Sequence, residues 1–383
     1  MPRFHGLKFT ESTGGTRPVS SVSSAVIGMV CAADDADAVA YPLNTPVLLT
    51  DVRGAIGKAG DDGDLAPSLQ AISDQTNPVV IVVRVEEGDD PAERAANIIG
   101  SNVGPAPTGL QALLTAKASL GISPRILGVP GFDSQAVTAA TAILAQKLRG
   151  FAYAGCADAD TIAEAVTYKN QFGQRELMLI YPGFTNGQND GLAIARALGL
   201  RARIDQEVGW HKTLSNVPVN GVTGLSRPVF FDMQDPASDA GVLNNADITA
   251  LINQNGYRFW GNRTCSADPL WAFESSVRTN WALRDIIDDS MRWAADLPLH
   301  PSIARDILET ANAAMRDLKA QGRIIDGEAW LEPSENTQAS LAAGQLHVTI
   351  DFTDVPPLEG LGITTRKTDK YLATFVNQVG AAG

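Results

Sequence analysis

The sequence NQNGYRFWGNRTCS, residues 253–266, is the stretch from which the fold is predicted most directly. Successive side chains of a strand alternate between its faces, so Tyr257 and Phe259 are expected on one side and Arg258 and Trp260 on the other. Glycines at positions 256 and 261 mark the two ends of this short strand. An aromatic-rich strand between two helices is typical of a core. We expect a core signature made of Tyr257, Phe259, Trp260 and Arg263.

The segments on either side of this strand are both predicted to be helical. Residues 242–252 carry apolar side chains at helix-like positions, and Asn255-Gly256 is a typical helix end. A long helix, residues 269–295, is expected to follow, with Asp268 as its N-cap and a proline in its first turn. The apolar stripe of that helix shifts part-way, which suggests more than one packing partner, and acidic and basic side chains share the other face.

Length and charge limit the classes of protein to which this chain can belong. At about 150 residues per domain, 383 residues fit two or three domains. The formal net charge of −13 argues against a nucleic-acid-binding surface and against binding to anionic membranes. No apolar run approaches the ~20 residues of a membrane-spanning helix, and no signal-peptide core is present, so a cytosolic protein is expected. The three cysteines form no metal-binding motif and are expected to be buried.

Short apolar strands alternate with helices in the first half of the chain. The run PVVIVVRVE, residues 78–86, is the strongest strand, and its unbroken apolar character predicts burial on both faces. A helix is expected over residues 108–120 and a strand over residues 176–181. The alternation predicts an α/β domain whose parallel or mixed sheet is covered by helices. After a loop-like stretch, another short strand is expected at residues 229–231.

The last third of the chain predicts a different arrangement. Residues 301–321 should form a helix with a clean apolar stripe, ended by Gly322. Two strands are expected at residues 324–331 and 345–353, and the second shows strict alternation of apolar and polar side chains. A short helix, residues 334–343, is expected between them.

An α/β pattern invites a search for a cofactor site, and the sequence offers none. No glycine-rich phosphate loop follows the first strand, and the glycine cluster at residues 54–64 carries Asp61 and Asp62, which would repel a phosphate. The four histidines show no metal-binding spacing, and His211 beside Trp210 is the best isolated candidate for a polar site. We therefore expect no catalytic, cofactor-binding or metal-binding residues. The alternative is a cytosolic α/β enzyme with an unrecognised small-molecule site.

Several segments together resemble contractile phage tail sheath proteins, including the sheaths of R-type pyocins. The run GYRFWGNRTCS followed by a long amphipathic helix is similar to the signature of this family. Also similar are GTRP from residue 15, PLNTP from residue 42, IARALGLRARIDQEVGWHKTLSN from residue 194 and DFTDVPPLEGLGI from residue 351. These matches span the chain, while residues 89–182 are less distinctive.

The resemblance implies an α/β and α+β fold. A two-layer C-terminal α/β sheath domain would carry an inserted outer α/β domain and extended terminal arms. The expected divisions are an N-terminal arm (1–20), the outer inserted domain (21–241), the tube-facing C-terminal domain (242–365) and a C-terminal arm (366–383). The arms would donate strands to neighbouring subunits through Phe4, Leu7, Phe9, Tyr371, Leu372, Phe375 and Val376.

The resemblance also implies a structural role without enzymatic activity. Subunits would polymerise as stacked six-fold discs around a tail tube, then contract to drive the tube through the host envelope for genome delivery. Partners would be other copies of the chain, the tail tube protein, and baseplate and tail terminator proteins, with no direct contact to nucleic acid or membrane. The protein would be assembled in the host cytoplasm and reside in the virion tail. The expected hinges are Gly14-Gly15 and residues 359–362, and the tube-facing candidates are Glu335, Arg278, Arg284, Asp285 and Asp288.

Overall fold

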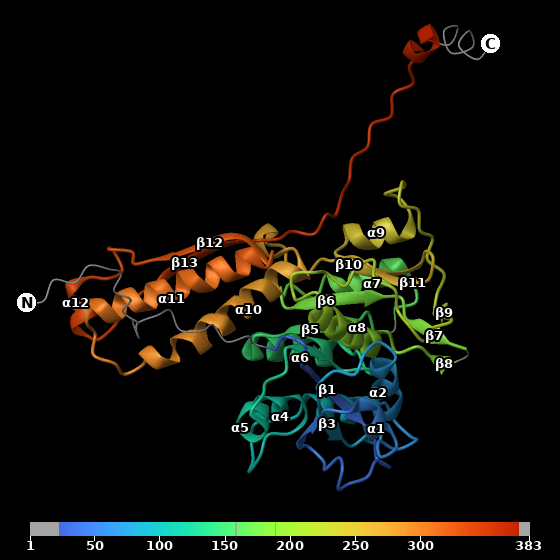
Figure 1. The fold of residues 1–383 in the computed structure, drawn as a ribbon. Coiled ribbons are helices and arrows are strands. Elements are labelled where there is room, and N and C mark those ends of the chain that lie inside the picture. Colours follow the sequence, from blue (N-terminus) through green and yellow to red (C-terminus); the bar gives the residue numbers. More distant parts are fainter. Residues whose placement is uncertain (1–22, 158, 188, 375–383) are drawn as a thin grey trace, which may run out of the picture.

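The computed structural model describes residues 23–157, 159–187 and 189–374 (Figure 1). These residues form an α/β body, a module of helices and a β-hairpin that projects from the body, and an extended C-terminal segment that leads away from both. The expected arm residues Phe4, Leu7, Phe9, Phe375 and Val376 lie outside the described residues. No helix of the described ranges is long and apolar enough to span a bilayer.

An eight-stranded sheet with the order β11-β10-β6-β5-β4-β1-β3-β2 forms the centre of the body. The strands from β10 to β3 run parallel to one another, and antiparallel β11 and β2 lie at the two edges. The central strands are buried on both faces, which explains unbroken apolar runs such as VIVVRV in β3. The strands are β1 (Ile27–Ala32), β2 (Pro46–Leu49), β3 (Val80–Val85), β4 (Ile126–Gly128), β5 (Phe151–Gly155), β6 (Leu177–Tyr181), β10 (Ile248–Asn253) and β11 (Tyr257–Trp260).

Helices cover both faces of this sheet, and each face has its own hydrophobic core. The first face is covered by α1 (Val52–Ile56), α2 (Leu65–Ser73) and α8 (Ala193–Glu207). The second face is covered by α3 (Pro91–Ile99), α4 (Gly109–Ala112), η1 (Leu113–Thr115), α5 (Ala116–Leu120), α6 (Gln135–Leu148), α7 (Ile162–Lys169) and α9 (Asp239–Asn245). A small antiparallel sheet, β7 (Phe184–Asn186), β8 (Asn189–Asp190) and β9 (Gly224–Leu225), lies beside the body.

Local sequence signals set the beginnings of several helices. Asp90 accepts hydrogen bonds from the backbone N–H groups of Ala92 and Glu93 at the start of α3, with a proline in the first helical position. Thr161 and Glu164 form a reciprocal capping box at the start of α7. These caps satisfy backbone donors that have no partner within the helix, and so fix where each helix leaves the sheet.

The projecting module is built on two long helices that lie side by side (Figure 1). Buried side chains of α10 and α11 pack together with Ile324 and Trp210 in a third hydrophobic cluster. The elements are η2 (Pro269–Trp271), α10 (Glu274–Met291), η3 (Arg292–Ala294), α11 (Pro301–Ala320), β12 (Ile324–Trp330), α12 (Gln338–Ala342) and β13 (Thr349–Asp354). Pro301 stands in the first turn of α11, and Gly322 follows its end at a positive φ of 68°, as predicted.

The prediction of a helix over residues 242–252 is wrong. The helix α9 ends at Asn245, and Ile248–Asn253 is strand β10, which pairs in parallel with β6 and antiparallel with β11. Asn255 and Gly256, at φ 52° and 103°, form the turn of this hairpin instead of ending a helix. The apolar run of β10 is buried because it fills the place beside β6, and that tertiary contact overrides the helical spacing.

The expected domain boundary at residue 241 therefore cuts through a single sheet. Strands β10 and β11, which were assigned to the C-terminal domain, are two of the eight strands of the body. The alternation within residues 257–260 is confirmed, since Phe259 and Tyr257 pack in the core of one face and Trp260 in that of the other. The projecting module begins after Cys265, which is buried in the body.

Three shorter predictions also need correction. The expected helix 269–295 begins with a separate turn, η2, capped by Asp268, and an extended Phe273 precedes α10. The expected helix 108–120 is divided into α4, η1 and α5. Residues 229–231 form no strand, because Phe230 donates its N–H to the Asp239 side chain and Val229 and Phe231 pack loosely on the second core.

Candidate functional site

Strands β12 and β13 form a sheet of only two strands. They pair antiparallel from Ile324 opposite Asp354 to Trp330 opposite Thr349, with an irregularity after Ile324. No third strand pairs with either of them among the described residues. An isolated two-stranded sheet is marginally stable in water and presents unpaired N–H and C=O groups along its edges.

One face of this two-stranded sheet is packed and the other is open. Ile350 and Phe352 pack against the cluster formed by α10 and α11, as strict alternation in the sequence predicts. Gly327 lets α11 approach closely, because a Cβ atom there would lie 3.0 Å from the Met315 sulfur. Glu328 and Asp351 face solvent. The helices thus hold the two strands in place without further strands.

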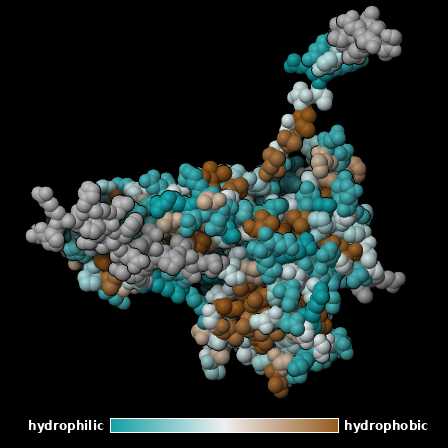
Figure 2. Space-filling view, in the orientation of Figure 1, coloured by the Kyte–Doolittle hydropathy of each residue, from teal (hydrophilic) through white to brown (hydrophobic). Residues whose placement is uncertain are grey.

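The C-terminal segment that follows β13 packs on nothing for most of its described length. It leads away from the body, and Figure 2 shows hydrophobic side chains along it. Leu358, Leu361 and Ile363 are 81%, 73% and 78% exposed. The segment ends in a short helical turn, η4 (Lys370–Thr374), in which Tyr371 and Leu372 are also exposed. Apolar side chains displayed in this way are typical of a segment that docks on another molecule.

A two-pronged ion pair anchors the beginning of this segment to the body. Arg263 donates through Nε to Glu359 Oε1 at 2.9 Å and through Nη2 to Oε2 at 2.6 Å. The hydrogen bond to Glu359 raises the pKa of Arg263. It is the only hydrogen bond or ion pair that ties residues 355–367 to the rest of the described chain. Gly360 and Gly362 come directly after it in open space, so the predicted hinge at residues 359–362 has its fixed end at Glu359.

Helix α10 joins the projecting module to the body through buried charges. Arg201 on α8 is fully buried, and its guanidinium contacts Asp205 at 2.7 Å and Glu274 at 3.2 Å. Arg278 contacts the same Asp205 at 2.5 Å, and Tyr153 of β5 donates its hydroxyl hydrogen to Glu274. These five residues, which we call the buried charge network, connect the sheet, α8 and α10.

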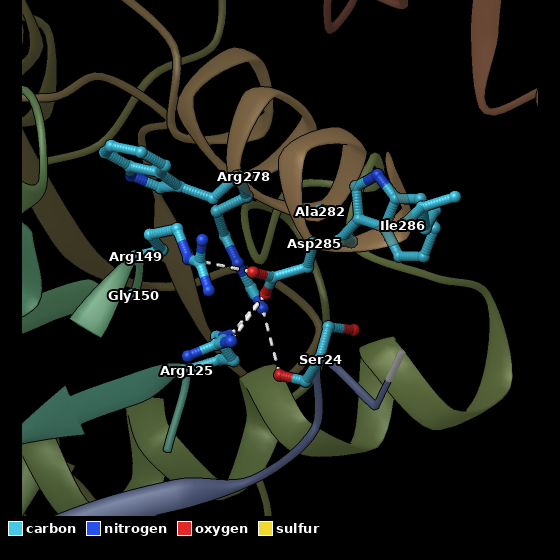
Figure 3. A pocket seen from close by; sticks show the side chains of 10 residues that line it. Ser24, Arg125, Arg149, Gly150, Arg278, Ala282, Asp285 and Ile286 are labelled. Carbon is cyan, nitrogen blue, oxygen red and sulfur yellow. Dashed lines mark hydrogen bonds and ion pairs between the residues drawn. The ribbon is translucent and has the colours of Figure 1, made fainter. Parts of the chain in front are cut away.

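A second charged contact lies further along α10. Asp285 is 4% exposed and contacts Arg125 at 2.6 Å and Arg149 at 2.9 Å. Figure 3 shows both guanidinium groups converging on its carboxylate, with Arg278 reaching the carbonyl oxygen of Ser24 nearby. The module is therefore tied to the body at two successive places along α10, and the two parts are suited to move as one unit.

These contacts correct part of the prediction of tube-facing residues. Arg278 and Asp285 are buried in ion pairs within the chain, so they do not form an exposed charged face. Arg284, Asp288 and Glu335 are not buried and stay predictions. The charged face of this helix had been predicted as a candidate contact with the tube. The i,i+4 pairs Arg201–Asp205 and Glu274–Arg278 were the one signal of the buried network that the sequence offers. The sequence does not show that these pairs also contact each other across two helices.

The carboxyl ends of β4, β5 and β6 border an open crevice, the position at which many α/β proteins bind ligands. Asp133, Cys156, Asp190 and Arg227 lie along it. No three His, Cys, Asp or Glu side chains within the described ranges are placed to hold a metal ion. His211 lies elsewhere, partly buried, and burial followed by the charge of Arg323 lowers its pKa.

The carboxyl group of Asp133 makes stability depend on pH. Burial, together with the carboxylates of Asp190 and Asp64, raises its pKa from 3.8 to about 7. The folded chain then keeps a proton that the unfolded chain loses, so this stabilisation is complete below about pH 4 and is lost as pH rises to about 7. We expect Asp133→Asn to unfold at a higher urea concentration than the wild type at pH 8, with the difference vanishing near pH 4. The exposed Asp62→Asn is the control, and a difference that does not change with pH would contradict the prediction.

Comparison with known proteins identifies the fold as that of a sheath subunit. Residues 24–85 match the N-terminal region of tail sheath protein Gp18 domain III, residues 106–265 the phage tail sheath protein central domain, and residues 266–368 the phage tail sheath C-terminal domain. The chain is 48% identical to the tail sheath protein of Escherichia phage P2, over 98% of both chains. The chain belongs to the phage tail sheath family. The resemblance noted in the sequence is thereby confirmed.

Other sheath proteins are similar over nearly their whole length. The major tail sheath protein of Serratia phage KSP20 is 43% identical, with 99% of each chain covered. Solved structures share the fold at lower identity. The helical sheath of the anti-feeding prophage in its contracted state matches at 18% identity with a TM-score of 0.72, covering 95% of this chain and 98% of that one. The sheath of an extracellular contractile injection system, also contracted, matches at 16% identity with the same TM-score of 0.72, covering 97% and 99%.

Family membership assigns this chain a structural role as a subunit of a tail sheath. The boundary between the central and C-terminal matches, at residues 265 and 266, coincides with the point at which the projecting module leaves the eight-stranded sheet. The α/β fold class is confirmed. The expected boundary at residue 241 lies inside the central match.

Proposed function

We propose that the subunit polymerises as stacked six-fold discs around a tail tube and contracts to drive the tube through the host envelope. The observation that carries the proposal is the two-stranded sheet of β12 and β13, together with an exposed C-terminal segment. Residues 355–367 of this segment bond to the rest of the described chain only through Glu359. The β12–β13 sheet has unpaired edges, and the C-terminal segment has exposed apolar side chains. Strand addition between copies would satisfy both.

Neighbouring subunits donate their terminal segments to this sheet. Each backbone hydrogen bond contributes only about 1 kcal/mol net, so a single donated strand would bind weakly. Two segments per subunit engage different neighbours, and the repeated connections hold the lattice together through effective concentration. Contacts of this kind join different surfaces of the two copies, so they propagate helically instead of closing into a dimer.

Contraction moves whole subunits while the exchanged strands stay paired. The buried charge network and the Asp285 contacts tie α10 to the body, so the change of conformation is concentrated in the linkers next to the donated strands. Gly360 and Gly362 provide the dihedral freedom at the C-terminal end. The solvent-accessible Arg284, Asp288 and Glu335 give the tube protein weak, salt-screened contacts that can break during sliding.

Partners beyond the sheath itself follow from this arrangement. The tail tube lies inside, baseplate and tail terminator proteins bind the two ends, and the subunit makes no direct contact with nucleic acid or membrane, in keeping with its net charge of −13. Assembly takes place in the host cytoplasm and the product resides in the virion tail. A chain in the six-fold symmetrised baseplate of the anti-feeding prophage shares this fold, which supports the proposed six-fold arrangement.

The purified full-length chain tests the proposal directly. We expect sedimentation at increasing protein concentration to show very large particles, and negative-stain microscopy to show tubules or stacked discs. The same sample should give little material the size of a dimer or tetramer once tubes have formed. A chain that stays monomeric or forms a small defined oligomer at high concentration would overturn the proposed function.

A further inference from the structure

The two edges of the β12–β13 sheet are not equivalent. Asn312 on α11 accepts a hydrogen bond from the Ala329 N–H through Oδ1 and donates one through Nδ2 to the Ala329 carbonyl, both at 2.9 Å. An amide side chain bonded in this way makes the same two contacts that a neighbouring strand would make. The free edge of β12 is therefore already occupied at Ala329.

The ladder geometry extends this closure to a second residue of β12. In an antiparallel pair, backbone groups point alternately toward the partner strand and away from it. Ala329, engaged by Asn312, points away from β13, and so does Gly327 two residues earlier. The Gly327 N–H donates to Asp326 Oδ1 at 3.0 Å, while Lys319 holds the other oxygen of Asp326 at 2.6 Å. Both of these outward N–H groups thus donate to side chains.

The edge of β13 carries no such closure. Ile350 and Phe352 lie opposite Ala329 and Gly327, so their backbone groups point outward on the other side of the sheet. Within the described ranges, the N–H and C=O groups of these two residues have no hydrogen-bond partner. The edge of β13 is ready to accept a strand.

We propose that β13 is the edge that accepts the first strand from a second copy, and that Asn312, with Asp326, keeps the β12 edge closed until assembly is under way. This inference rests on the proposed function and adds an order to it. Side-chain closure of an edge also prevents edge-to-edge aggregation of free subunits. If the β12 edge opens only after β13 has paired, the strands are added in a fixed order as the polymer grows.

The occupant of the β13 edge is the C-terminal segment of a second copy. Leu361 and Ile363 are spaced as alternate residues of a strand and are exposed in the free subunit. The residues that follow are basic, RKTDK from Arg366 to Lys370, whereas the exposed face of the sheet carries Glu328 and Asp351. Apolar spacing and opposite charge therefore both favour this segment as the added strand.

Opening the β12 edge by mutation tests the role of Asn312. We expect Asn312→Ala to shorten the lag before tube formation, followed by light scattering, by about tenfold, since two hydrogen bonds no longer have to be exchanged. Hydrogen exchange at the Ala329 amide should also become faster in the free subunit. Arg316→Ala, an exposed change on the same helix, is the control and should leave the lag unchanged. An unchanged or longer lag for Asn312→Ala would overturn the inference that Asn312 closes the β12 edge.

A second pair of variants covers the case in which Asn312→Ala does not fold. Asp326→Ala frees the Gly327 N–H and should shorten the lag, whereas Lys319→Ala removes the ion pair and keeps Asp326 Oδ1 as acceptor, so the lag should stay that of the wild type. Equal lags for these two variants would count against the proposal.

The β13 edge is tested by removing one outward N–H group. Ile350→Pro and Ile350→Ala both lose the side-chain packing, but only proline loses the N–H, and an edge strand tolerates a proline whose N–H faces solvent. We expect both to fold and only Ile350→Ala to form tubes.

In the wild type, hydrogen exchange at the Ile350 and Phe352 amides should slow on assembly, whereas the Ala329 amide should already be protected in the free subunit. Tubes from Ile350→Pro, or unchanged exchange at these amides, would overturn the assignment, whereas a wild type without tubes would overturn the proposed function itself.

Discussion

Removal of residues 1–16 or residues 369–383 is expected to abolish tube formation and to leave a folded, soluble subunit. Residues 1–16 form a polar stretch with only isolated apolar side chains, and Tyr371 and Leu372 are exposed. The terminal segments therefore contribute little to the stability of a single copy, while a lattice held by exchanged strands depends on them completely.

The two deletions can be compared with a chain that lacks only residues 381–383, Ala-Ala-Gly. Circular dichroism and thermal unfolding should give the same melting temperature for all of these chains and the wild type, within about 2 °C. Sedimentation should show large particles only for the wild type and for the short truncation. Tubes built by either deleted chain would contradict strand exchange, and a deleted chain that unfolds would place that terminus in the core of its own subunit.

Arg201→Met is expected to lower the free energy of unfolding by several kcal/mol. Arg201 is fully buried and contacts Asp205, Glu274 and the carbonyl oxygens of Gly209 and Lys212. Without it, Arg278 is the one cation of the described chain that still forms ion pairs with both buried carboxylates, and Tyr153 still donates a hydrogen bond to Glu274. Breaking a buried ion pair by removing one partner costs about 3–5 kcal/mol, because the remaining charge is left uncompensated.

Urea unfolding at pH 7 measures this loss, and the exposed pair Arg316–Glu309 supplies the control. Both side chains of that pair are 62% exposed and their charged atoms are 3.9 Å apart. Arg316→Ala should therefore change the free energy of unfolding by less than about 1 kcal/mol. If Arg201→Met were no more destabilising than Arg316→Ala, the network would not be what ties α8 to α10.

The parts of the fold that could be predicted are those in which one stretch of sequence has one structural meaning. The unbroken apolar run around Val80–Val85 allows only a strand buried on both faces, and Pro301 and Gly322 mark the two ends of α11. The alternation at Ile350 and Phe352 likewise fixed which side of β13 is packed.

The errors arose where a distant segment decides the outcome. The apolar residues before Asn253 fit a helix and a strand equally well, and only the empty place beside β6 selects the strand. Arg278 and Asp285 on α10 were predicted to face the tube because their partners, namely Asp205, Arg125 and Arg149, lie far away in the sequence. The closure of β12 by Asn312 could not be predicted either, since it depends on the exact height of α11 above the hairpin.

In the proposed polymer, the contact between Arg263 and Glu359 would fix where the donated C-terminal segment leaves each subunit. Because the guanidinium and the carboxylate meet through two parallel hydrogen bonds, the C-terminal segment of each copy starts from a defined point and in a defined orientation on the body. Each of the following residues spans about 3.3 Å when extended, so their number limits the distance between this copy and the copy that receives the segment. Under the proposed strand exchange, the spacing between copies in a filament therefore depends in part on a single intramolecular side-chain contact.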